Sequence, residues 1–66
     1  MSATIERALY VGPWKSRYDI FDDVTITLIN GEKVKGTIED LDDNCVYIET
    51  ENGHCSVSVN HIKDCN

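Results

Sequence analysis

A strict alternation of apolar and polar residues begins at Val24 and dominates the rest of the sequence. Val24, Ile26 and Leu28 are apolar, whereas Thr25 and Thr27 between them are polar. This period of two is typical of a β-strand that buries one face, because successive side chains on a strand point to opposite sides. The pattern therefore predicts strands rather than helices for this part of the chain.

Turn signals divide the alternation into strands. Asn30-Gly31 and Asn52-Gly53 favour tight hairpin turns, because both residue types adopt positive φ at low cost. A third turn is predicted at residues 42–44, where two aspartates precede an asparagine. Five antiparallel strands result, the last from Ile62 to about Cys65. The apolar positions that they are expected to bury are Val24, Ile26, Leu28, Val34, Ile38, Leu41, Val46, Ile48, Val57, Val59 and Ile62.

Gly36 lies on the apolar side of the second predicted strand. Glycine inside a strand typically marks a sharp bend, a bulge or a close approach of two backbones. A meander that bends at such a point tends to curl into a small barrel. We therefore expect an all-β fold in which residues 24–66 form a small, strongly bent five-stranded antiparallel barrel.

Residues 1–23 do not share this alternation. Pro13 could open a helical segment in which Trp14, Tyr18 and Phe21 share one face. The apolar residues upstream of Pro13 fit a helical turn or a short strand equally well. We expect residues 1–23 to form a short helical or irregular segment that caps one end of the barrel, so that the whole chain is one domain.

The length of the chain raises the question of what stabilises it. A domain of 66 residues buries only about 60% of the surface that its unfolded chain exposes, and such domains usually gain stability from disulfides, a metal or self-association. The odd number of cysteines (Cys45, Cys55 and Cys65) and the absence of a Cys-x-x-Cys pair argue against a disulfide framework and a standard zinc site. A looser zinc set, His54-Cys55 with His61 and Cys65, is less favoured than thiols that pack as small apolar groups. Self-association through open sheet edges is the remaining candidate.

The net charge of the chain bears on its partners, and its apolar pattern bears on its compartment. The chain has 12 acidic and 6 basic residues, a net charge of −6, whereas generic nucleic-acid-binding proteins are basic. Residues 1–21 contain three basic and two acidic residues, and residues 22–66 contain three basic and ten acidic ones. There is no long apolar run and no N-terminal pattern of a secretion signal, so we expect a soluble, cytoplasmic protein without a membrane partner.

The stretch from Val24 to Ile48 resembles the first signature of the Sm and Sm-like (LSm) proteins, a family that includes bacterial Hfq. The resemblance depends on the spacing Gly31-x4-Gly36-x5-Asp42 within alternating apolar residues, and with the final hairpin it covers roughly two-thirds of the chain. It implies a short N-terminal helix and a bent five-stranded barrel. It also implies a homo-oligomeric ring of about five to seven copies, in which the fourth strand of one subunit pairs with the fifth strand of the next. Single-stranded RNA would bind at turns near the pore.

The resemblance places candidate RNA-binding residues at two turns and on one strand face. The first turn contains Asp42 and Asn44, and the second contains Asn60 and His61. The strand face carries Lys33 and Lys35, on a surface that Hfq uses for A-rich RNA. The chain departs from the family at both turns, which lack an aromatic residue beside the asparagine and an Arg-Gly or Lys-His pair at residues 59–61. The candidate residues of the oligomer interface are Val57, Val59, Ile62 and Cys65.

Two functions stay open at this point. The glycine spacing motivates an Sm-like ring that binds single-stranded RNA in RNA processing or regulation. The acidic surface and the missing pore cation favour an Sm-like oligomeric scaffold, a protein-interaction module without RNA binding. We expect no enzyme, no catalytic residues, no cofactor and no metal ligands, because neighbours such as His54 and Cys55 point to opposite faces of a strand and no phosphate-binding glycine loop occurs.

Overall fold

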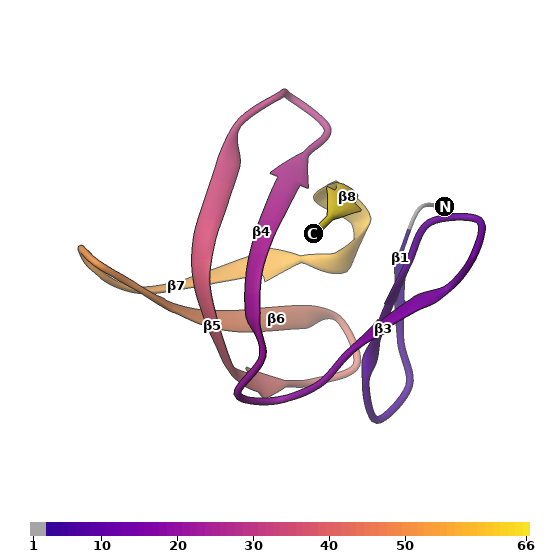
Figure 1. Ribbon diagram of the computed structural model, residues 1–66, viewed down its shortest axis with the longest axis horizontal. Coiled ribbons are helices and arrows are strands. Elements are labelled where there is room, and N and C mark those ends of the chain that lie inside the picture. Colours follow the sequence, from indigo (N-terminus) through magenta and orange to yellow (C-terminus); the bar gives the residue numbers. More distant parts are fainter. Residues whose placement is uncertain (1–2) are drawn as a thin grey trace.

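The computed structural model describes residues 3–66, in which eight β-strands and a three-residue 3₁₀ helix are the regular elements. The strands form two antiparallel sheets, one of three strands and one of five (Figure 1). The predicted all-β class is therefore confirmed. No helix within residues 3–66 is long and apolar enough to cross a membrane.

The larger sheet begins where the alternation of the sequence begins, and its five strands correspond to the five predicted ones. In chain order they are β4 (Asp23–Leu28), β5 (Lys33–Leu41), β6 (Cys45–Thr50), β7 (Gly53–Ser58) and β8 (Ile62–Cys65), with the 3₁₀ helix η1 (Val59–His61) before β8. Their order in the sheet is β7-β6-β5-β4-β8. The outer strands are therefore β7 and β8, and neither pairs with a further strand in the part of the chain that the structure describes.

The smaller sheet corrects the expectation of a helical or irregular N-terminal segment. It consists of β1 (Ala3–Ile5), β2 (Leu9–Val11) and β3 (Ser16–Tyr18). Pro13 lies in a tight turn, closed by a hydrogen bond of 3.1 Å that the Lys15 amide donates to the Gly12 carbonyl, with both residues at positive φ. The side chains of Trp14 and Phe21 are 90% and 83% exposed, so the shared apolar face of a helix does not form.

Both sheets contribute to one core. Of the eleven predicted core residues, eight are buried and the other three, Leu28, Val34 and Leu41, are partly buried against them. The smaller sheet adds Ala3, Leu9 and Val11 to the same cluster, and Leu9 has no exposed surface. Burial of this kind is the main stabilising contribution to a fold, so the N-terminal strands are part of the packing.

Strand β5 is bent along its length (Figure 1). A Cβ atom at Gly36 would overlap the carbonyl oxygen of Glu49 and lie 2.8 Å from Cγ2 of Ile48, so only glycine lets β5 and β6 approach this closely. Further along, the register between β5 and β6 shifts between Ile38 and Asp40, which is the mark of a β-bulge. The expected bend at Gly36 thus coincides with a close backbone approach.

Candidate functional site

The two predicted RNA-binding turns lie side by side in the fold. The amide of Val59, at the start of η1, donates a hydrogen bond of 2.8 Å to the carbonyl of Asn44 in the β5–β6 turn. Asn44, Asn60 and His61 are all exposed. The fold therefore brings the backbones of the two turns into contact, and we call their three exposed residues the turn cluster (Asn44, Asn60 and His61).

Asp42 has a structural role in this turn. Its carboxylate accepts hydrogen bonds from the amides of Asn44 (2.8 Å) and Cys45 (2.7 Å) and from the hydroxyl of Tyr47 (2.6 Å). These bonds, that from Tyr47 foremost, lower the pKa of the Asp42 carboxyl. The carboxylate of Asp42, a predicted RNA-binding residue, thus holds the turn together through three hydrogen bonds.

Sequence reasoning missed Tyr47, the aromatic residue next to the turn. It lies on β6, five positions after Asp42, and its side chain is 37% exposed. The bond to Asp42 raises the pKa of the Tyr47 hydroxyl. The only signal in the sequence is its outward position between Val46 and Ile48, because the contact itself depends on how the turn folds back on the strand.

Lys33 and Lys35 are exposed near the start of β5, at the end of this strand that is remote from Asn44. His61 is nearer to them, because its carbonyl accepts a hydrogen bond from the amide of Ile29, and Thr27 pairs with Lys33. Lys33 begins β5 and Asn44 follows its end, a distance of roughly 25–30 Å along a strand of this length. The two lysines line an open hollow of about 610 Å³ together with Glu49 and Glu51. Two carboxylates thus share the hollow with the two ammonium groups, which weakens the attraction of phosphate.

The four predicted interface residues are buried in the core of their own chain. Val57, Val59, Ile62 and Cys65 are between 2% and 7% exposed. Burial is also the main reason that the pKa of the Cys65 thiol is raised to about 11. Their side chains support the outer strands from inside, so pairing with a neighbour at these strands would have to use backbone groups.

Strand β7 presents an open backbone edge. The hydrogen bond from Val59 to Asn44 continues the pairing of β7 with β6 by one residue pair. In an antiparallel pair, residues that bond across alternate with residues whose backbone groups point outward. By this alternation the backbone groups of His54, Ser56 and Ser58 face away from β6. The strand contains neither proline nor Lys, Arg, Asp or Glu, and these are the usual residues that protect an open edge.

At the outer edge of β8, backbone groups of Cys65 are hydrogen-bonded within the chain. The hydroxyl of Tyr18 donates a hydrogen bond of 2.9 Å to the carbonyl of Cys65, and the amide of Cys65 donates one of 2.8 Å to the side chain of Asp64. The smaller sheet therefore lies against this outer strand. Burial is the first cause of the raised pKa of Tyr18, ahead of the charges around it.

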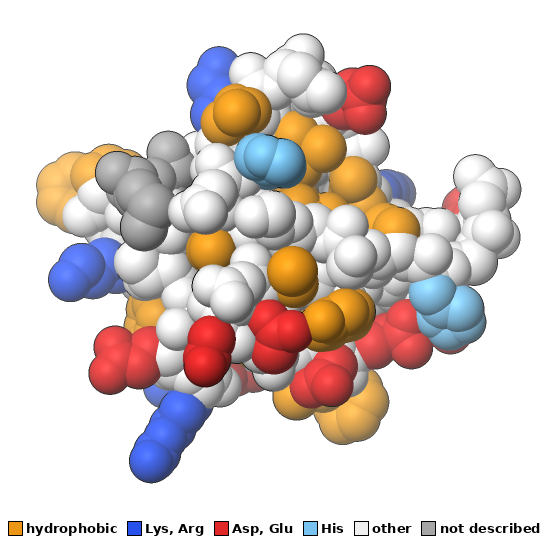
Figure 2. All heavy atoms as spheres, turned by 180° about the vertical axis from the view of Figure 1, so that it is seen from behind, with side chains coloured by type: hydrophobic (Ala, Val, Ile, Leu, Met, Phe, Trp, Pro, Cys, Tyr) orange, Lys and Arg blue, Asp and Glu red, His pale blue; other side chains and the backbone are white. Residues whose placement is uncertain are grey.

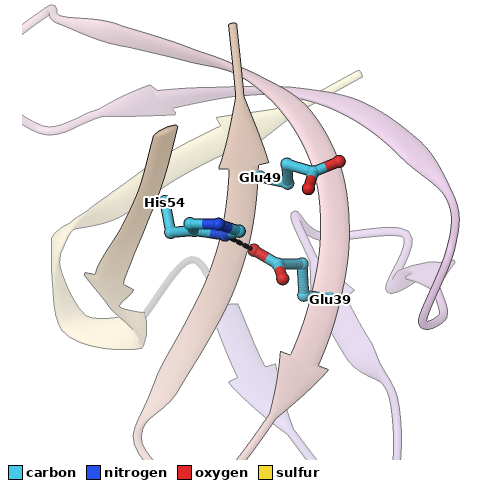
Figure 3. Close-up of side chains that lie close together, drawn as sticks. All are labelled: Glu39, Glu49 and His54. Carbon is cyan, nitrogen blue, oxygen red and sulfur yellow. Dashed lines mark hydrogen bonds and ion pairs between the residues drawn. The ribbon is translucent and has the colours of Figure 1, made fainter. Parts of the chain in front are cut away.

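A cluster of Glu39, Glu49 and His54 lies on three adjacent strands (Figure 3). Nδ1 of His54 is 2.5 Å from Oε1 of Glu39, and this hydrogen bond, more than the charge of Glu39 itself, raises the pKa of the imidazole. The alternative zinc set drawn from the sequence does not form. Among the described residues, His54 groups with the two glutamates and not with His61 or Cys65.

The charge distribution on the surface follows the acidic composition. Figure 2 shows one face, on which Asp and Glu side chains gather along the lower part while Lys and Arg side chains lie at the rim. A long polyanion such as a nucleic acid would be repelled by the lower part of this face (Figure 2).

Comparison of the chain with protein-family models, with curated proteins and with solved structures gave no match.

Proposed function

We propose that the chain is an Sm-like domain that assembles edge to edge into a homo-oligomeric ring and binds single-stranded RNA at the turn cluster. The observation that carries the proposal is the strand order β7-β6-β5-β4-β8. Counted from Val24, the two outer strands are the fourth and the fifth. These are the strands that pair between neighbouring subunits in the Sm-like family which the sequence resembles.

Two further features support an Sm-like bent barrel. Gly36 allows β5 to cross close to β6, and the bulge between Ile38 and Asp40 adds a second local distortion to the same strand. Both devices increase the curvature of a sheet. A ring then places the β7 edge of one copy against β8 of the next, and an intersubunit hydrogen bond replaces the one that Tyr18 makes to Cys65.

The turn cluster has suitable groups for single-stranded RNA. The amides of Asn44 and Asn60 can donate to and accept from base edges, and the imidazole of His61 offers a ring on which a base can stack. Because the cluster contains no Lys or Arg, each copy binds weakly. A ring repeats the cluster in every subunit, and this multivalency raises the overall affinity.

Light scattering coupled to size exclusion tests the assembly. We expect a mass of about five to seven subunits for the wild type. The variant Ser56→Pro removes an outward amide of β7 and should give a monomer with an unchanged far-UV circular dichroism spectrum, because proline is tolerated at an edge strand. The matched control Ser56→Ala keeps the amide and should assemble like the wild type.

Two outcomes would contradict the ring. One is a wild-type mass of one subunit that persists at high concentration. The other is a stable dimer, which would indicate pairing of two β7 strands about a two-fold axis. A Ser56→Pro variant that retains the full mass would show that the β7 edge is not the contact.

Titration of labelled U-rich and A-rich oligonucleotides at two salt concentrations tests RNA binding. We expect affinity that falls only weakly with salt, because few phosphates are neutralised, and a loss of about tenfold or more in the double variant Asn44→Ala/Asn60→Ala. The double variant Lys33→Glu/Lys35→Glu is the control and should bind like the wild type. Loss of binding in the lysine variant alone would show that RNA binds at the hollow lined by Lys33 and Lys35, and not at the turn cluster.

The second candidate is an oligomeric scaffold without RNA binding. It is favoured by the ten acidic residues among residues 22–66 and by the carboxylates that share the hollow of Lys33 and Lys35. A well-formed ring that binds neither oligonucleotide at low salt would establish this candidate and exclude the first.

A further inference from the structure

We propose that Glu39, Glu49 and His54 form a binding site for one divalent transition-metal ion, with Zn²⁺ the ion best suited to their donor atoms. The site lies on the face of β5, β6 and β7 that points away from the core (Figure 3). It is separate from the turn cluster and adds a ligand to the function proposed above.

The sheet register brings the three side chains together. Glu49 of β6 is the direct cross-strand partner of His54 of β7. On β5, the bulge sets two residues, Glu39 and Asp40, against the single residue Tyr47. A bulge of this kind redirects side chains and is frequent beside functional sites. Here it gives the outer face two carboxylates where a regular strand has one.

The donor atoms are close to the spacing that a metal ion requires. One ligand atom from each residue lies within 4.8 Å of the other two. Zinc bonds of about 2.0–2.2 Å in tetrahedral geometry hold neighbouring ligand atoms about 3.4 Å apart. Since all three side chains are exposed, rotation about their side-chain bonds can close the difference without moving the backbone.

The kinds of donor favour zinc over the common hard cations. Two carboxylates and one imidazole make a mixed oxygen and nitrogen set that suits Zn²⁺ and Co²⁺, whereas Mg²⁺ and Ca²⁺ prefer oxygen alone. A hollow of about 570 Å³ adjoins the cluster and is lined by Glu39 and His54 with Asp40, Tyr47, Cys55 and Ser56. It leaves room for water molecules to complete the coordination.

The electrostatic surroundings also favour a cation at this place. The carboxylates of Glu39 and Glu49 lie beside the imidazole of His54 and give the cluster negative charge. A metal ion would lie between Nδ1 of His54 and the carboxylate of Glu39, which already contact each other. The neighbouring Asp40 adds negative charge at the rim of the hollow.

The test is a calorimetric titration of the full chain with Zn²⁺, repeated with Co²⁺ for its visible absorption, in a buffer with excess Mg²⁺ and a thiol-free reductant. We expect saturable binding of one ion per chain, weakened about tenfold or more by His54→Gln and by Glu49→Gln. The matched control His61→Gln changes the other exposed histidine and should bind like the wild type. Far-UV circular dichroism checks that each variant is folded.

The thiol of Cys55 provides the competing explanation, because it lines the same hollow. The variant Cys55→Ser should bind zinc as tightly as the wild type, and its Co²⁺ complex should lack the strong charge-transfer band of a thiolate ligand. The proposal is wrong if zinc shows no saturable site, if His54→Gln and His61→Gln bind equally, or if Cys55→Ser loses the ion. None of these results depends on assembly or on RNA. A failure of the zinc proposal therefore leaves the proposed ring and RNA binding untouched, and the reverse also holds.

Discussion

Replacement of Gly36 by alanine is expected to destabilise the fold by about 3 kcal/mol or more. The new Cβ atom would overlap the backbone carbonyl oxygen of Glu49 and press on the side chain of Ile48. A backbone oxygen in the middle of a ladder cannot rotate away, so β5 and β6 would have to separate. A small domain has a total stability of only several kcal/mol, and the variant should therefore unfold at a much lower urea concentration than the wild type.

The matched control for Gly36 is Gly31→Ala. Gly31 has a φ of +91°, but a Cβ atom at this position would meet no atom within 4 Å, so alanine there costs only the strain of the left-handed backbone, about 1–2 kcal/mol. Urea unfolding should be followed by far-UV circular dichroism, because the single tryptophan is already 90% exposed in the folded protein. Equal midpoints for the two variants would refute the close-approach argument.

Replacement of Leu9 by alanine is the second change with a large expected effect. Leu9 is completely buried in the core that the two sheets share, and truncation of a buried leucine typically costs about 2–5 kcal/mol, because it leaves a cavity. The control is Ile29→Ala, since Ile29 is 64% exposed and its truncation should cost about 0.5 kcal/mol or less. The measurement is again the urea midpoint of each variant.

The Leu9 comparison decides whether the N-terminal sheet belongs to the stable core. If Leu9→Ala and Ile29→Ala unfold at the same urea concentration, the smaller sheet contributes nothing to global stability. If Leu9→Ala is much less stable, unfolding of the two sheets is coupled. The contact between Tyr18 and Cys65 is the specific polar link between them.

Much of the larger sheet could be predicted because its information is local. Alternation and Asn-Gly turns identify strands and hairpins from neighbouring residues alone, and every apolar position predicted as core is buried or partly buried. Gly36 could be singled out because glycine on the apolar side of a strand needs a structural reason. The atoms that it approaches, on β6, could not be named from the sequence.

The N-terminal segment could not be predicted in the same way. Its strands have three residues each, too few for a period to be read, and the turn at Gly12 and Lys15 uses positive φ at a residue that rarely adopts it. Pro13 and the spacing of the aromatic residues fit a helix locally. Burial of Leu9 and Val11 against the larger sheet decided otherwise.

The candidate sites likewise combine features that the sequence predicts with contacts that it does not. The strands, the turns and the burial pattern of residues 24–66 follow from local sequence patterns, because a period of two and turn residues act through neighbours along the chain. Three contacts arise instead from the folding of the whole chain: Asn44 lies against η1, Tyr47 donates a hydrogen bond to Asp42, and Glu39, Glu49 and His54 lie close together. These contacts depend on register and on a bulge, which are set by how strands pair across the sheet rather than by any one segment.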